Sequence, residues 1–331
     1  MMEQRQFGST DLRVSTIGFG GWAIGGPAMA GSQPIGWGTV DDATSEQALR
    51  EAFACGMTFY DTADIYGLGH SEELIGRVFA NRKDVVIATK VGHRQGSDGS
   101  LTLDYSRDHI LRACEKSLKR LRRDCIDYYQ LHSARVEHLR QGECIDAMEQ
   151  LQRKGLIRYW GLSLNTFTPF PEAEHMIRHR QGDGFQLVLN ILNQRAIPLL
   201  RRMREAGYGI IVRMPLQFGL LTGKFSLGTT FGKNDHRAVR LTPGVLEAAL
   251  PLLEKVWTIA EGNSMSKTSL ALSFCSSFKE VSTVIPGIKT PQQAQENTSG
   301  VTRLAAKDRR TLLSLFDADL QRLVDLMEEQ G

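Results

Sequence analysis

This 331-residue sequence lacks the usual signals of membrane or nucleic-acid proteins. It has no run of the ~18 to 20 apolar residues that a membrane-spanning helix needs, and no charged start followed by an apolar stretch of the kind that opens a signal peptide. Its formal net charge is only +3, and its Lys and Arg residues are scattered. We therefore expect neither a membrane nor nucleic acid as a partner, and we expect a cytoplasmic location.

Cysteine is also scarce. The five residues form an odd number without a C-x-x-C spacing, and several lie in apolar helical patterns: Cys55, Cys114, Cys125, Cys144 and Cys275. This usage favours free thiols in a reducing compartment. We expect no disulfide framework and no metal site.

What the sequence does contain is enough apolar material for a large core. Hydrophobic residues make up 41% and charged residues 23%, as in an ordinary globular protein. The length allows one large domain or two. No low-complexity linker divides the chain, so we predict a single domain over residues 1–331.

Strand-like and helix-like segments alternate after a predicted β-hairpin formed by residues 5–8 and 13–16. The predicted strands cover residues 17–20, 58–61, 85–90, 126–132, 157–163, 185–191, 209–214 and 282–285. The predicted helices between and after them cover residues 42–55, 71–80, 107–122, 138–154, 171–180, 194–206, 266–278 and 291–299, with extra helices at 245–261 and 306–329. Eight such repeats predict an α/β fold, a (β/α)8 TIM barrel, better than an open sheet.

A dinucleotide-binding fingerprint near the N-terminus is a false match. Gly18-x-Gly20-x-x-Ala23 follows a predicted strand, and Asp41 lies about 20 residues further on. Residues 24–38 contain five Gly and two Pro, so they cannot form the helix whose N-terminus would hold a pyrophosphate. We predict instead a long loop over the barrel mouth, with Trp22 and Trp37 as apolar walls for a substrate.

Polar side chains end three consecutive predicted strands, at Asp61, Lys90 and His132. The carboxyl ends of barrel strands share one mouth. Lys90 ends an apolar strand, which is costly unless a carboxylate meets it, and Asp61 is the available partner. Tyr66 follows in the adjoining loop; its phenol, with a pKa of about 10, becomes a better proton donor where an ammonium lowers that pKa. A turn-capping Asp61, a purely structural Asp61 and Lys90 ion pair, and a core role for His132 remain open alternatives.

These residues stand in motifs that resemble the aldo-keto reductase family. Asp-Thr-Ala-x-x-Tyr-Gly-x-Gly-x-Ser-Glu-x-x-x-Gly (61–76), Ala-Thr-Lys (88–90) and Leu-His (131–132) look like that family's catalytic tetrad in its usual order. The segments 161–163, 185–190, 215–224 and 285–297 resemble its later cofactor motifs. The resemblance covers nearly the whole chain. It implies that Asp61, Tyr66, Lys90 and His132 are the catalytic residues.

The resemblance further implies a nicotinamide dinucleotide that lies extended across the mouth, with NADPH favoured and NAD possible. Ser163 and Gln186 would bind its carboxamide. Gln293 stands where many members carry Arg for the 2′-phosphate, which leaves Lys289 and Thr290 as the candidate phosphate contacts, with Lys289 as the favoured cation. Arg213 replaces the Tyr that some members stack on the nicotinamide; its guanidinium can stack there too, which we favour, or can reach a substrate anion. The full set of implied cofactor-binding residues is Gly21, Trp22, Asp61, Ser163, Gln186, Arg213, Pro215, Leu216, Gly219, Leu221, Gly223, Lys224, Gly287, Lys289, Gln293, Glu296 and Asn297.

By the same resemblance, the expected activity is reversible reduction of an aldehyde or ketone to the alcohol, with Tyr66 as proton donor. Loops 23–40, 92–104 and 224–240 would select the substrate, a small-molecule carbonyl or a sugar-like compound. The expected substrate residues are Trp22, Trp37, Tyr66, His93 and His132. The alternative is a cofactor-binding partner protein that resembles potassium-channel β subunits, although the few residues before the hairpin lead us to expect no tethered inactivation segment. The sequence does not indicate which oligomeric state the protein adopts.

Overall fold

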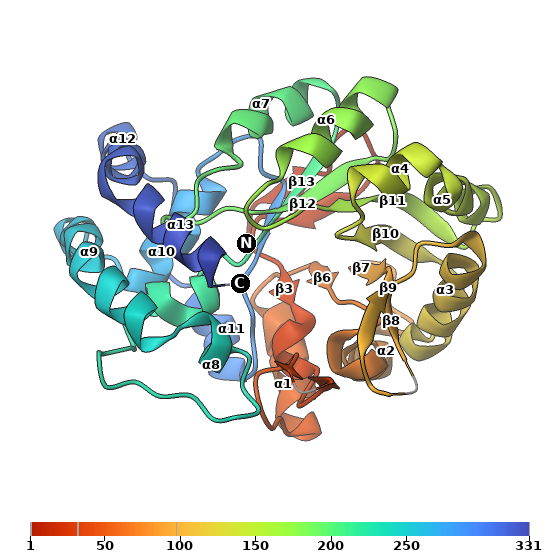
Figure 1. The fold of residues 1–331 in the computed structure, drawn as a ribbon, viewed down its shortest axis with the longest axis horizontal. Coiled ribbons are helices and arrows are strands. Elements are labelled where there is room, and N and C mark those ends of the chain that lie inside the picture. The colour runs from red at the N-terminus through yellow and green to blue at the C-terminus, as the bar shows by residue number, and fades with distance from the viewer. Residues whose placement is uncertain (1, 32, 97, 331) are drawn as a thin grey trace.

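The computed structural model describes residues 2–31, 33–96 and 98–330, and it confirms the predicted barrel (Figure 1). Met1, Ser32, Ser97 and Gly331, which the predicted single domain over residues 1–331 includes, lie outside the described residues. The central sheet joins eight parallel strands in the order β14 (Thr283–Ile285), β13 (Gly209–Arg213), β12 (Gly184–Val188), β11 (Ile157–Ser163), β10 (Ile126–His132), β7 (Val86–Val91), β6 (Phe59–Asp61) and β3 (Phe19–Gly20).

Backbone bonds between the first and last barrel strands close this sheet. Gly18 N donates to Val284 O at 2.8 Å, and Val284 N donates to Thr16 O at 2.9 Å. One step further on, Gly20 N donates to Pro286 O at 2.9 Å. The carboxyl ends of all eight strands therefore surround one opening. This is the shared mouth that was predicted for the strands that end in Asp61, Lys90 and His132.

A ring of helices covers the outside of the sheet (Figure 1). These are α1 (Asp42–Ala54), α2 (His70–Phe79), α3 (Arg107–Leu121), α4 (Val136–Gln141), α5 (Glu143–Arg153), α6 (Phe170–His179), α7 (Ile197–Glu205), α10 (Lys267–Ser276) and α11 (Pro291–Thr298). Several of these helices are capped at their start by a side-chain oxygen that accepts a hydrogen bond from a backbone N–H group of the first turn. Asp41 caps α1, Ser106 caps α3 and Ser266 caps α10 in this way. The predicted helix 138–154 is interrupted at Gly142, whose φ of 81° breaks the helical path between α4 and α5.

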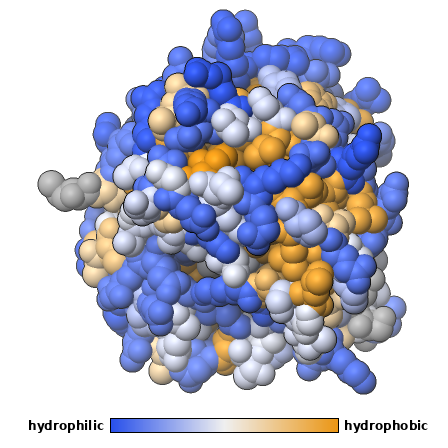
Figure 2. Space-filling model, turned by 90° about the vertical axis from the view of Figure 1, so that its left-hand side faces the viewer, coloured by the Kyte–Doolittle hydropathy of each residue, from blue (hydrophilic) through white to orange (hydrophobic). Residues whose placement is uncertain are grey.

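The extra helices were also predicted. They are α9 (Pro243–Gly262), α12 (Ala306–Leu315) and α13 (Gln321–Glu329), and a π-helical turn over Phe316–Leu320 joins the last two. Figure 2 shows the side of the molecule to which α9 and α12 belong; hydrophilic side chains cover much of it, and apolar side chains gather in its upper half and on its right. Within the described residues, no helix is both long and apolar enough to span a membrane.

The N-terminal hairpin closes the end of the barrel opposite the mouth. Strands β1 (Gln4–Gln6) and β2 (Arg13–Ser15) pair antiparallel, and Phe7 is fully buried beneath the barrel. Its ring lies 4.9 Å from that of Tyr128, between centroids, in an edge-on contact. A Cβ on Gly209 would lie 2.5 Å from the Phe7 ring, so glycine is required where the hairpin meets β13. Phe7 and its neighbours thus fill the floor of the barrel, opposite the end at which the predicted polar strand ends lie.

The loops at the mouth are more ordered than the sequence predicts. Residues 24–38 include the short antiparallel strands β4 (Met29–Ala30) and β5 (Gln33–Pro34), and β7 is followed by a hairpin of β8 (His93–Gln95) and β9 (Leu101–Leu103). Short helical turns η1 (Gly21–Ile24), η2 (Tyr66–Gly69), η3 (Gln217–Thr222) and α8 (Arg237–Arg240) complete the rim. The exposed large apolar side chains of the described chain all lie in segments that follow barrel strands: Met29, Leu68, Leu103, Leu227 and Val239.

Candidate active site

Lys90 is the centre of the candidate site. It lies near the end of β7, and its side chain is only 1% exposed. Its Nζ donates to Asp61 Oδ1 at 2.5 Å, to Thr62 O at 2.7 Å and to Tyr66 Oη at 3.0 Å. Burial acts to lower the pKa of Lys90, but the Asp61 carboxylate and the Tyr66 oxygen outweigh it and raise that pKa. The ammonium is thus held charged in the interior, and the predicted ion pair with Asp61 is confirmed.

Asp61 is held by polar side chains from other strands as well. Its second oxygen, Oδ2, accepts bonds from Gln130 Nε2 at 3.1 Å and from Gln186 Nε2 at 2.7 Å. A buried carboxylate needs such donors on both oxygens. Gln186, which the family resemblance assigned to a nicotinamide carboxamide, therefore donates its amide N–H to Asp61 in this structure.

Tyr66 begins the tight turn η2, which follows β6 after a short loop. The following residue, Gly67, has φ 60°, and a Cβ there would collide with Gly25 O, so only glycine fits. The Tyr66 ring makes an edge-on contact with Trp22 at 4.9 Å between centroids. Burial raises the pKa of Tyr66 even though the Lys90 ammonium lowers it. Lys90 thus lowers the pKa of Tyr66 as expected, but burial outweighs this effect and the net pKa is raised. The phenol therefore stays protonated at neutral pH.

His132 ends β10, and its ring faces Tyr66 at 6.0 Å between centroids. In strand register it pairs with Ser163, which pairs in turn with Gln186, so three predicted site residues stand side by side at the mouth. Burial, together with His93, Lys90 and Arg213, holds the pKa of His132 well below its ordinary value. His132 is therefore neutral and can donate a hydrogen bond to a carbonyl oxygen or accept one from an alcohol.

Arg213 lies at the end of β13, close enough to the tetrad that its charge acts on Tyr66 and His132. Its Nη2 donates to Leu164 O and to Thr166 Oγ1, both at 3.1 Å. Its Nε is buried and has no partner within the described residues. The guanidinium is anchored beside the tetrad and keeps one N–H group available.

The predicted phosphate-binding residues gather around the start of α11. Lys289 Nζ donates to Trp37 O at 2.7 Å, and Gln293 Oε1 accepts from Lys289 N at 2.7 Å. Lys224 Nζ lies 3.8 Å from Glu296 Oε2. Asn297 is buried, and its amide nitrogen finds no partner in the part of the chain that the structure describes. The structure thus brings the β13–η3 segment and the β14–α11 segment together at this edge.

The other predicted cofactor residues line the same rim. Gly21 opens η1, where a Cβ would lie 2.7 Å from Asp61 O. A Cβ on Gly287 would lie 2.8 Å from the Trp37 ring. Five more lie within or beside η3: Pro215, Leu216, Gly219, Leu221 and Gly223.

Sequence reasoning missed the way in which two mouth loops join. His236 N donates to Gly36 O at 3.0 Å, and its Nδ1 lies 2.9 Å from Pro34 O. The His236 ring lies 5.8 Å from that of Trp22, between centroids. Trp37 and Asp235 form an antiparallel bridge at the same crossing. The pairing joins residues about 200 positions apart, and no local pattern indicates it.

Unpaired polar atoms at the mouth test whether a nicotinamide dinucleotide fits. Buried nitrogens without a partner in the described chain occur on Trp22 (Nε1), Trp37 (Nε1), His93 (Nδ1), His132 (Nδ1), Arg213 (Nε) and Asn297 (Nδ2). Leaving such groups unpaired costs roughly 1 to 3 kcal/mol each, so this gathering indicates a polar ligand. The residues present fit the dinucleotide.

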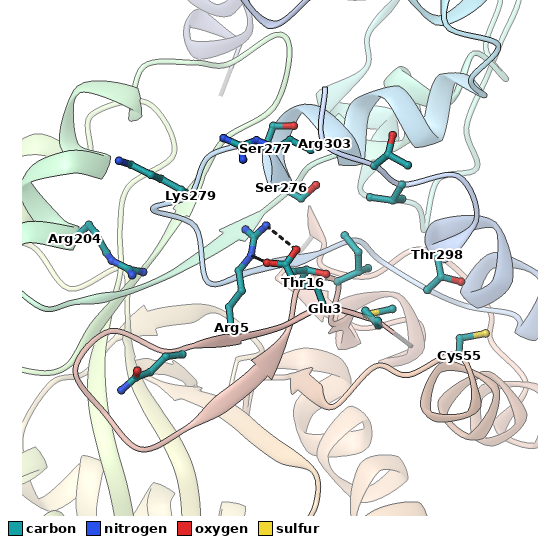
Figure 3. A pocket seen from close by; sticks show the side chains of 15 residues that line it. Glu3, Arg5, Thr16, Cys55, Arg204, Ser276, Ser277, Lys279, Thr298 and Arg303 are labelled. Carbon is teal, nitrogen blue, oxygen red and sulfur yellow. Dashed lines mark hydrogen bonds and ion pairs between the residues drawn. The ribbon is translucent and has the colours of Figure 1, made fainter. Parts of the chain in front are cut away.

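A cavity of about 730 Å³ opens at the other end of the barrel (Figure 3). It is lined by residues of the N-terminal hairpin, of the end of α7 and of the segments around 276–279 and 298–303, including Arg5, Arg204, Lys279 and Arg303. Arg5 is bound there to Glu3 and to Val281 O. None of the tetrad residues lines this cavity, so we do not assign the chemistry to it.

The chain is similar to known proteins over most of its length. The chain is 31% identical to the NADP(+) aldo-keto reductase yakc of Schizosaccharomyces pombe over 86% of its length and 83% of the relative's. It is 29% identical to a putative voltage-gated potassium channel subunit beta of the same organism, over 90% and 87% of the two chains. The glycerol dehydrogenase AKR11B4 from Gluconobacter oxydans superposes with a TM-score of 0.80 at 25% identity, covering 96% of this chain and 95% of that one. The family model described as "Aldo/keto reductase family" matches residues 16–314, and the chain belongs to that family.

Proposed function

We propose that this protein is an NAD(P)H-dependent oxidoreductase that interconverts an aldehyde or ketone and the corresponding alcohol. The observation that carries the proposal is the hydrogen bond from the buried Lys90 ammonium to the Tyr66 phenol, backed by the Asp61 carboxylate. A phenol in this setting can release its proton to a developing alkoxide, because the ammonium stabilises the phenolate that remains.

Each member of the tetrad has a separate task in this proposal. Tyr66 donates its proton to the carbonyl oxygen in reduction and accepts it back in oxidation. Lys90, held by Asp61, stabilises the phenolate, and neutral His132 orients the carbonyl oxygen by a hydrogen bond. A nicotinamide dinucleotide, when bound, supplies the hydride. Ser163, Arg213, Lys289 and Asn297 would hold it across the mouth.

A second candidate is a cofactor-binding partner protein. The similarity to a putative potassium channel subunit favours it, because an intact tetrad can persist in a protein whose main role is binding. A carbonyl-substrate screen that follows the absorbance of NADPH and NADH distinguishes the two. Turnover of a small aldehyde or ketone supports the reductase, whereas tight dinucleotide binding without any turnover favours the binding protein.

The dinucleotide preference depends on Lys289. We propose a preference for NADPH, because this half-buried ammonium can exchange its bond to Trp37 O for one to a 2′-phosphate. Burial and Arg237 lower the pKa of Lys289, and an added phosphate dianion would favour its charged form.

Lys289→Ala should therefore weaken NADPH binding by about tenfold or more and leave NADH binding nearly unchanged. Fluorescence titration of both dinucleotides measures this directly. Lys279→Ala is the matched control, since Lys279 is an exposed cation that lines the cavity at the other end of the barrel. An equal loss for NADPH and NADH in Lys289→Ala would rule out phosphate reading, and tighter binding of NADH to the parent would overturn the preference itself.

Arg213→Ala separates two uses of the guanidinium. We expect cofactor binding to weaken about tenfold for every substrate alike, because Arg213 leads into Pro215 and η3 and its Nε still needs a partner. NADPH titration beside kinetics on one charged and one neutral aldehyde tests this. Unchanged NADPH affinity with a selective loss of kcat/KM on the charged aldehyde would make Arg213 a substrate-specificity residue instead.

A further inference from the structure

The cavity at the floor end of the barrel has no role in the proposed chemistry. Its volume of about 730 Å³ lies within the range of about 300 to 1,000 Å³ that is typical of small-molecule sites. Four parts of the chain line it: the N-terminal hairpin, the end of α7, the loop after α10 and the segment that joins α11 to α12. The cavity is therefore large enough for a small ligand and is formed by segments that only the fold brings together.

Positive charge dominates the lining of this cavity. Arg5, Arg204, Lys279 and Arg303 all line it, and Glu3 is the one carboxylate among the lining residues that the structure describes. Arg5 is compensated, because its Nε donates to Glu3 Oε1 at 3.0 Å. The other three cations form no ion pair with a carboxylate of the described chain, and Figure 3 shows them above and to the left of the Arg5 side chain. The excess of positive charge suits an anionic ligand.

The number and type of these cations favour a phosphate group. Arg204 and Arg303 carry planar guanidinium groups, whose N–H donors match the oxygens of a phosphate. A phosphate monoester carries a charge of about −1.5 to −2 at neutral pH, so it can use three cations where a carboxylate needs one or two. Arg204, Lys279 and Arg303 are exposed, and a dissolved anion therefore reaches them without a change in the fold.

Hydroxyl groups line much of the remaining surface of the cavity. They belong to Thr16, Ser276, Ser277, Thr298 and Thr302. Thr16 is buried, and its hydroxyl forms no hydrogen bond with any residue that the structure describes. A ligand with hydroxyl groups of its own would satisfy it, whereas an apolar ligand would leave it unpaired. The lining thus favours a ligand with a phosphate group and a hydroxyl-bearing body.

Hydrogen bonds between the four lining segments hold the cavity in shape. Ser9 N of the hairpin donates to Gly207 O, just beyond α7, at 2.8 Å. Leu304 N, in the segment before α12, donates to Ser277 Oγ at 2.8 Å. Arg5 Nη1 joins the hairpin to the loop after α10 through its bond to Val281 O at 2.9 Å. The walls are therefore pre-organised, which lowers the conformational cost of binding a ligand.

We propose that this cavity is a binding site for a small phosphorylated sugar or polyol. Arg204, Lys279 and Arg303 bind the phosphate group, and Thr16 bonds to a hydroxyl group of the ligand body. The site lies at the end of the barrel opposite the tetrad, so the inference goes beyond the proposed function and does not depend on it.

Isothermal titration calorimetry on the full chain tests the inference with five probes: glycerol 3-phosphate, ribose 5-phosphate, inorganic phosphate, glycerol and ribose. At least one of the two phosphorylated compounds should bind about tenfold more tightly than inorganic phosphate, and glycerol and ribose should show no measurable binding. Arg204→Ala and Lys279→Ala should each weaken the binding of the phosphorylated compound about tenfold. Thr16→Val keeps the shape of the side chain and should weaken that binding about fivefold, while the affinity for inorganic phosphate stays unchanged.

Arg201→Ala is the matched control, because Arg201 is an exposed arginine of the same helix, it does not line the cavity, and Glu205 already accepts its hydrogen bond. It should leave the binding unchanged. Lys289→Ala, at the mouth, should also leave it unchanged, and Arg204→Ala should leave carbonyl reduction and NADPH affinity unchanged. A failure of both phosphorylated probes to bind would overturn the inference, as would inorganic phosphate that binds as tightly as they do. An equal loss in Arg204→Ala and Arg201→Ala would reduce the attraction to surface charge, and a loss in Lys289→Ala alone would place the binding at the mouth; either result would overturn the inference and leave the proposed function standing.

Discussion

Replacing Tyr66 by Phe is expected to lower the kcat/KM of carbonyl reduction by about a thousandfold while leaving dinucleotide affinity nearly intact. General acid catalysis contributes roughly 10²- to 10⁴-fold to such reactions. The phenol oxygen is the one atom of Tyr66 that Phe lacks, and Lys90 Nζ is its hydrogen-bond partner. The ring contact with Trp22 can persist in the variant, so the fold and the dinucleotide groove should survive.

Steady-state kinetics beside fluorescence titration of NADPH measures the two effects separately. Tyr105→Phe is a matched control, because it also removes a single hydroxyl from a buried tyrosine near His132, but one that bonds to a backbone carbonyl. It should cost stability and spare most of the activity. Turnover in Tyr66→Phe that approaches the parent's would show that another group donates the proton.

The pH profile of the parent gives a second check on Tyr66. Its raised pKa keeps the phenol protonated through the neutral range, and the strongly lowered pKa of His132 keeps that imidazole neutral. The kcat/KM for reduction should therefore stay level from about pH 6 to about pH 9. It should fall above the ordinary phenol pKa of about 10, because the proton donor is then lost. A decline already near neutrality would mean that a different group titrates.

The barrel could be predicted from the sequence because its signals are local. Alternation of apolar strands with helical periods located all eight strands to within a few residues, and side-chain caps such as Asp41 and Ser106 explain why the helices start where they do. The β8–β9 hairpin also had a local signal in Asp98-Gly99 between alternating residues, and it was missed. The break at Gly142 depends on one glycine in an otherwise helical pattern, which periodicity alone does not resolve.

The site was predictable only where a charge needed a partner. Lys90 lies at the end of an apolar strand, which predicted a carboxylate partner. In the structure this partner is Asp61 on the neighbouring strand. Gln130 and Gln186 meet Asp61 from two other strands through the closure of the barrel, and nothing local in either segment indicates this contact. The crossing of His236 over Gly36 likewise joins loops that only the folded barrel brings together. Hydrogen bonds between segments that lie far apart in the sequence are therefore the part of the site that could not be predicted from the sequence.

Lys90→Met is expected both to abolish reduction and to lower the free energy of unfolding by about 3 kcal/mol. Breaking a buried ion pair by removing one partner typically costs about 3 to 5 kcal/mol, because the other charge is left uncompensated. Asp61, whose side chain is 3% exposed, would lose its 2.5 Å bond to Nζ. Gln130 and Gln186 still donate to its other oxygen, which places the expected loss near the lower end of that range.

The double variant Asp61→Asn with Lys90→Met distinguishes the structural part of this loss from the catalytic part. A neutral amide in place of the Asp61 carboxylate would leave no buried charge without a partner, so the double variant should recover part of the stability and none of the activity. Urea denaturation of the parent, both single variants and the double variant gives the coupling free energy between the two sites. A Lys90→Met variant as stable and as active as the parent would show that the ion pair is incidental. Full stability without activity would confine Lys90 to catalysis, because the Asp61 carboxylate would then be compensated by Gln130 and Gln186 alone.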